Sequence, residues 1–98
     1  MMYQQGDVLL FRVPAAPAGV PVGHCVLATG EATGHQHEAI GQGVELIERD
    51  GTLFLLAPHG ATVIHQEHRA LTLPPGAYRV GRVREYDHFA EEARQVLD

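Results

Sequence analysis

The sequence predicts a mostly β protein, a small β-barrel or sandwich of six to seven short strands with one C-terminal helix. Three observations predict this fold class. The apolar runs are short and lack helical spacing, proline and glycine interrupt the chain between them, and only the final residues show helical periodicity. Because the chain has 98 residues, 45% of them hydrophobic, we expect a single domain, 1–98, with one modest core.

The first half of the chain contains two expected strands. Residues 7–13 form a short apolar run that suits a strand buried on both faces, and residues 24–28 suit a second strand. Residues 14–23, between them, hold three prolines and two glycines, which is typical of an extended loop. Residues 29–43 contain too many turn residues for one regular element.

The clearest local signal is a β-hairpin over residues 44–57. Two β-prone runs, 44–49 and 52–57, flank Asp50-Gly51, a pair in which both residues readily adopt positive φ. Further strands are expected at residues 61–66, 71–73 and 78–86. A helix is expected over 88–97, because Asp87 can cap it and apolar residues recur at helical spacing at positions 89, 93, 96 and 97.

Composition excludes several classes of function. The formal net charge of −5 argues against nucleic acid as a partner, although Arg79, Arg82 and Arg84 crowd one segment. The absence of lysine excludes lysine-based covalent catalysis. Cys25 is the only cysteine, so no internal disulfide forms. The opening residues show neither the basic region of a signal peptide nor a membrane span, and we therefore expect a cytoplasmic protein.

Histidine is the distinctive residue type of this chain. Seven of the 98 residues are histidine, and His35 and His37 form an H-x-H pair. On an extended segment, residues i and i+2 project to the same face, so these two imidazoles can reach one ion. Gly34, just before the pair, permits a sharp turn of the backbone.

A second pair, His65 and His68, lies in the tetrapeptide H-Q-E-H. If this piece stays extended, His65 and Glu67 share a face and His68 points away. If the strand ends near Gln66, His65 and His68 converge instead. A helical zinc motif would need H-E-x-x-H spacing, and the β-prone residues before His65 argue against it.

Together the two pairs predict a metal site in which His35, His37 and His65 are ligands. Glu67 is a fourth ligand or a general base, and His68 is a ligand if the strand ends near Gln66. Imidazole with carboxylate suits a divalent transition metal, with Zn, Fe, Mn, Ni and Cu all open. The remaining histidines are interpreted as turn residues, namely His24, His59 and His88.

Two resemblances accompany these patterns. The segments 3–9, 30–37, 65–68, 73–80 and 84–86 resemble a family of short, uncharacterised bacterial proteins with GEATGHxH and HxEH motifs. This resemblance implies a compact domain in which the two histidine pairs go together, and it implies no activity.

A partial resemblance to cupins rests on fewer residues. His35 and His37 match the H-x-H pair of these metal-holding β-barrels, and residues 74–76 resemble their P-x-G turn. However, Glu45 comes too late after His37, and Arg79 stands where a cupin has its distant histidine. An analogous barrel therefore fits as well as a cupin.

Two functions follow as hypotheses. The first is a small soluble metal-binding domain, extending to a metal-dependent enzyme with a small-molecule substrate. The alternative is a non-enzymatic β module that associates with itself or a partner, with its histidines serving assembly or pH response. A homo-oligomer, most simply a dimer, is expected in either case, because small barrels leave edges or open ends that self-association covers.

Overall fold

The computed structural model describes residues 1–30 and 32–84 of the chain. This part consists of β-strands and their connections, and the helix expected over 88–97 lies outside it. The strands are β1 (Met2–Gln5), β2 (Val8–Val13), β3 (Val20–Pro21), β4 (Val26–Thr29), β5 (Gln36–Ile40), β6 (Glu45–Arg49), β7 (Thr52–Ala57), β8 (Ala61–Ile64), β9 (Leu71–Leu73) and β10 (Gly76–Arg82).

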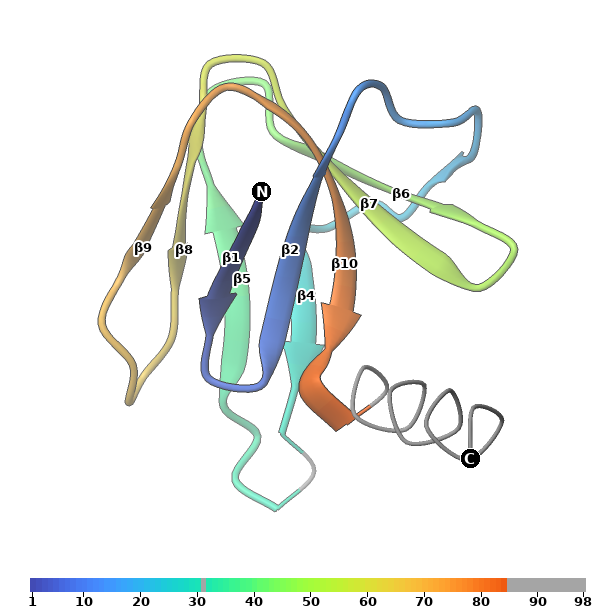
Figure 1. The fold of residues 1–98 in the computed structure, drawn as a ribbon. Coiled ribbons are helices and arrows are strands. Elements are labelled where there is room, and N and C mark those ends of the chain that lie inside the picture. The colour runs from blue at the N-terminus through green and yellow to red at the C-terminus, as the bar shows by residue number, and fades with distance from the viewer. Residues whose placement is uncertain (31, 85–98) are drawn as a thin grey trace, which may run out of the picture.

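The ten strands form two antiparallel sheets rather than a closed barrel (Figure 1). One sheet has six strands in the order β1-β2-β10-β7-β6-β3, and the other has four in the order β4-β5-β8-β9. The prediction of a mostly β fold is confirmed. Of the two predicted architectures, a barrel or a sandwich, the barrel is wrong, and six to seven strands are too few. The three additional strands, β1, β3 and β5, lie in segments whose glutamine, proline and histidine content hid them.

The hairpin predicted around Asp50-Gly51 is present. Strands β6 and β7 pair antiparallel, with Arg49 opposite Thr52, so the connection is a tight two-residue turn. Asp50 has a φ of 50° and Gly51 a φ of 80°, the positive values that this turn demands.

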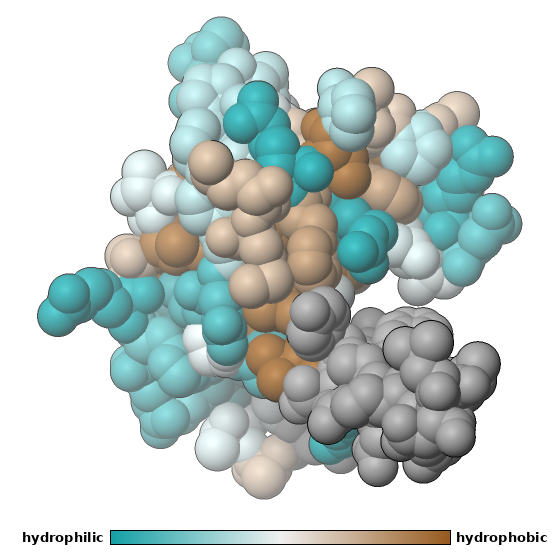
Figure 2. Space-filling model, viewed as in Figure 1, coloured by the Kyte–Doolittle hydropathy of each residue, from teal (hydrophilic) through white to brown (hydrophobic). Residues whose placement is uncertain are grey.

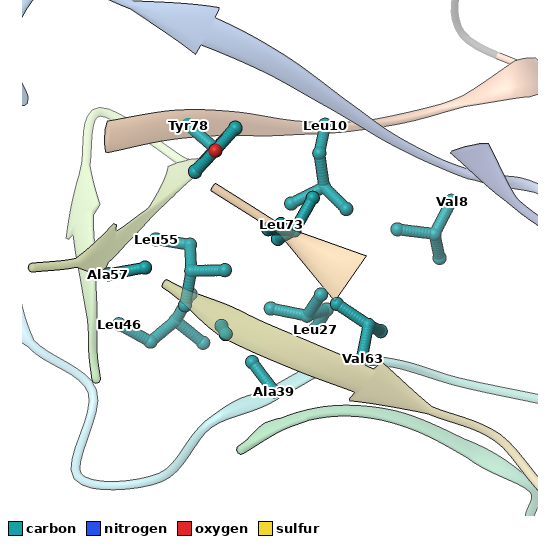
Figure 3. Close-up of a cluster of buried hydrophobic side chains, with 11 residues drawn as sticks. Val8, Leu10, Leu27, Ala39, Leu46, Leu55, Ala57, Val63, Leu73 and Tyr78 are labelled. Carbon is teal, nitrogen blue, oxygen red and sulfur yellow. The ribbon is translucent and has the colours of Figure 1, made fainter. Parts of the chain in front are cut away.

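One hydrophobic core lies between the two sheets (Figure 3). Leu10, Leu55 and Tyr78 enter it from the six-stranded sheet, and Val63 and Leu73 from the four-stranded sheet; each is at most 1% exposed. The Tyr78 hydroxyl donates a hydrogen bond to the Pro74 carbonyl, so the one polar atom of this large side chain is satisfied. Burial of these side chains from both sheets therefore holds the sheets together.

The surface of the molecule carries both hydrophobic and hydrophilic side chains. On the face shown in Figure 2, hydrophobic side chains gather along the middle, over β1 and β2, and hydrophilic ones surround them. Among residues 1–30 and 32–84, no helix has the length and apolar character needed to cross a membrane.

Candidate metal site at one end of the sheets

Three connections meet at the lower end of the molecule in Figure 1: the β1–β2 turn, the β4–β5 loop and the β8–β9 loop. The β4–β5 loop turns back sharply because Gly34 has a φ of 71°, and it is closed by hydrogen bonds between Gly30 and residues 34 and 35. His35 lies just before β5 and His37 near its start, whereas His65 and His68 lie in the loop after β8. Pairing of β5 with β8 therefore brings the two histidine pairs to the same end.

The four imidazole rings are close neighbours. The ring centres of His65 lie 4.3 Å from His37, 4.6 Å from His68 and 5.6 Å from His35. The His37 and His68 ring centres are 5.8 Å apart. Two imidazoles on one tetrahedral ion, with bonds of ~2.0–2.1 Å, would have ring centres ~5 Å apart. The ring-centre distances in the cluster fall on both sides of this value.

His37 is the anchored member of the cluster. It is 5% exposed, and its Nδ1 lies 2.9 Å from the Oε1 of Gln5 on β1. The Gln5 amide group donates to the carbonyls of Val63 and Arg69, at 2.8 and 3.0 Å. Because both amide hydrogens face carbonyls, the Gln5 Oε1 must face His37, and His37 Nδ1 must be the donor.

The tautomer of His37 follows from this contact. A neutral imidazole that donates from Nδ1 carries its lone pair on Nε2, the form in which a histidine binds a metal. Burial, reinforced by the neighbouring His65, lowers the pKa of His37, so the ring is neutral at neutral pH although Asp7 acts in the opposite direction. The lone pair of His37 Nε2 is therefore available to bind a metal ion.

Asp7, in the β1–β2 turn, faces that nitrogen. Its Oδ1 lies 3.7 Å from His37 Nε2, and its Oδ2 accepts hydrogen bonds from Nε and Nη2 of Arg82. Burial would raise the pKa of Asp7, but the Arg82 guanidinium outweighs it, and the pKa is lowered. The carboxylate is thus ionised beside the cluster.

The β8–β9 loop fastens the other side of the site. Gln66 accepts a hydrogen bond from the backbone N–H of Gln36 through Oε1, at 2.9 Å, which ties this loop to the start of β5. Within the loop, the Glu67 backbone N–H donates to His65 Nδ1 at 3.0 Å. The Glu67 carboxylate lies 3.5 Å from His35 Nδ1 and is 67% exposed.

The structure therefore brings together all five residues that the sequence singled out, His35, His37, His65, Glu67 and His68. Within the described residues, no group of three or more His, Cys, Asp or Glu side chains is placed so that it could hold a metal ion as it stands. The histidines interpreted as turn residues include His24 before β4 and His59 before β8, at the opposite ends of the strands that carry the cluster. His88 lies outside the described residues.

Sequence reasoning missed Gln5, Asp7 and Gln66. Gln5 and Asp7 flank Gly6, whose φ is 57°, so a turn residue between a polar and an apolar run was the available signal for a hairpin. Nothing in the sequence marks Gln5 as a buried side chain, because its burial depends on contacts with residues 58 and 64 positions away.

Fold and site together define a two-sheet antiparallel β domain with a four-histidine cluster at one end. The chain belongs to the family described as Domain of unknown function (DUF8820), whose model matches residues 4–83. The matched range includes both histidine pairs and Asp7. No curated protein and no solved structure matches the chain, and the resemblance to cupins is not shown.

Proposed function

We propose that this domain binds one divalent transition metal ion through its histidine cluster. The observation that carries the proposal is the gathering of four imidazoles from two separate loops, with ring centres 4.3–5.8 Å apart. The core explains why β5 and β8 pair, but it does not require four imidazoles at one end of that pair. A shared ligand accounts for them.

The state of His37 supports a metal rather than a cluster of surface histidines. Ligand histidines commonly donate one ring N–H to a fixed acceptor, which orients the ring and leaves the other nitrogen free. Gln5 supplies such an acceptor, and it is itself held by two backbone carbonyls. A surface histidine has no need of a buried partner that fixes its tautomer.

Coordination requires modest side-chain movement. His65 is partly exposed and His68 is exposed, so their rings can turn about χ1 and χ2 toward His37 without disturbing the core. His65 must give up the hydrogen bond from the Glu67 backbone or bind through Nε2. The site is thus preformed at His37 and adjustable at its other members.

The small pocket beside the histidine cluster favours a binding domain over an enzyme. The pocket beside His65 is lined by residues 36, 38 and 64–66 and has a volume of about 200 Å³. Sites for small molecules usually measure ~300–1,000 Å³. Glu67 remains the candidate base should a small substrate reach the metal.

Elemental analysis of untagged protein tests the proposal. We expect close to one transition metal ion per chain, removable by a chelator and restored by added metal. The double variant His35→Ala/His37→Ala should lose binding, whereas His24→Ala and His59→Ala should keep it. Affinity should fall in acid solution, because protons compete for the ligand nitrogens.

Two outcomes would contradict the proposal. Wild-type protein that neither carries nor takes up a metal ion would leave the self-associating or partner-binding module as the reading of the cluster. Undiminished binding by the double variant would place the metal elsewhere on the chain.

A further inference from the structure

We infer that Asp7 is the carboxylate ligand of this metal ion and that Arg82 positions it. The inference rests on the proposed function, and it assigns a ligand on a third segment of the chain, the β1–β2 turn. Glu67, the carboxylate that the sequence suggested, is then a peripheral residue.

The first step concerns the space between His37 and Asp7. The Nδ1 of His37 is taken up by Gln5, and its other ring nitrogen, Nε2, lies 3.7 Å from the Oδ1 of Asp7. This separation exceeds that of a hydrogen bond. Two ligands on one tetrahedral ion, with bonds of ~2.1 Å, stand ~3.4 Å apart. The two atoms are therefore spaced much as two ligands of one cation would be.

The second step concerns how Asp7 is held. Arg82 donates through both Nε and Nη2 to the same oxygen, Oδ2. The other oxygen, Oδ1, is not bonded by Arg82, and it is the one that faces His37. A charged partner that fixes one oxygen and leaves the other for the ion is a common outer-shell arrangement at metal sites.

The third step places another imidazole against the same turn. A Cβ added at Gly6, the residue before Asp7, would lie 2.6 Å from Nε2 of His68. This ring thus approaches the backbone of the turn more closely than any residue but glycine would permit. Two imidazoles therefore approach the β1–β2 turn, His37 at the Asp7 carboxylate and His68 at the backbone of Gly6.

Glu67 is less well placed than Asp7. Its carboxylate lies 3.5 Å from His35 Nδ1, and the side chain is 67% exposed against 51% for Asp7. Both carboxylates face an imidazole nitrogen, but Asp7 is also held by the charged Arg82, and Glu67 is the more exposed of the two. A set of at least two imidazoles and one carboxylate suits Zn²⁺, Fe²⁺ or Mn²⁺ better than the soft Cu⁺.

The experiment loads the full-length protein with Co²⁺ and compares matched variants. Asp7→Cys should give an intense near-ultraviolet band from thiolate-to-Co²⁺ charge transfer, because the new sulfur lies in the coordination shell. Glu67→Cys should give no such band, and wild-type protein, with Cys25 alone, serves as the blank. Asp7→Asn should weaken Co²⁺ binding at least tenfold, and Glu67→Gln less than threefold.

A further variant tests Arg82 as a positioning residue. Arg82→Gln should weaken Co²⁺ binding in the wild-type background but have little further effect when combined with Asp7→Asn. A residue acting only as a nearby positive charge would behave oppositely, because its removal would tighten binding of a cation.

The outcomes separate the inference from the proposed function. If wild-type protein binds Co²⁺ and Asp7→Asn binds it equally well, with a band in Glu67→Cys instead, the inference is overturned and the metal site stands. If wild-type protein binds no Co²⁺, both fall. Should Asp7→Asn fail to fold, the band in Asp7→Cys, with folding checked by circular dichroism, decides the assignment.

Discussion

Replacing Gln5 by leucine should destabilise the metal-free protein by about 2–4 kcal/mol. The side chain is 3% exposed and makes three hydrogen bonds, to the carbonyls of Val63 and Arg69 and to His37 Nδ1. Each such hydrogen bond contributes ~0.5–1.5 kcal/mol net to stability. Buried partner groups that lose their hydrogen bond add to the destabilisation. Leucine has nearly the same size, so the change removes polar contacts rather than volume.

Urea denaturation in the presence of a chelator measures this effect without the contribution of a bound ion. Gln4→Leu is the matched control, because Gln4 is the exposed neighbour on β1 and makes one hydrogen bond, to the Gly6 carbonyl. We expect the control to change the free energy of unfolding by less than ~0.5 kcal/mol. Equal effects of the two variants would refute the view that Gln5 joins the sheets and orients His37.

Three further predictions concern the fold. Gly51→Ala should cost about 1–2 kcal/mol in urea denaturation, because φ is 80° while a new Cβ would meet nothing within 4 Å; an unchanged midpoint would contradict a tight turn there. Burial raises the pKa of the Tyr78 phenol above its ordinary 10.0. The free energy of unfolding should therefore be unchanged below pH 10 and fall as pH rises through the folded-state pKa. A Tyr78→Phe protein that shows the same loss would exclude Tyr78 as the cause. In sedimentation at tens of micromolar protein we expect a homo-oligomer, most simply a dimer, since Met2 on an edge strand is 49% exposed; a monomer mass would contradict this.

The parts of the fold that the sequence predicted are those with a local cause. Asp50-Gly51 specifies its turn through φ alone, so the hairpin was predictable to within a residue. The division into two sheets has no local cause. β10 pairs with β2 across more than 60 residues, and neither strand carries a sequence mark for its partner.

In the candidate site, too, only the residues with a local sequence signal were predicted. The H-x-H spacing on an extended segment, with Gly34 before it, led us to expect His35 and His37 at one place, and their rings do meet those of the second pair. The role of these rings as ligands stays a prediction. The sequence indicates only that Asp7 begins a strand. Its role at the site was missed because its neighbours there come from β5 and β10, which only the tertiary structure brings together.

The position of β10 between β2 and β7 has a consequence for synthesis of the protein. During translation β2 and β7 emerge well before β10, so each waits with an open hydrogen-bonding edge and an apolar inner face. The six-stranded sheet can close only when β10 inserts at its centre, which makes folding a late event and favours slow kinetics. Nascent chains that end before Gly76 should therefore be held by chaperones, and premature termination there should yield aggregates rather than a smaller folded domain.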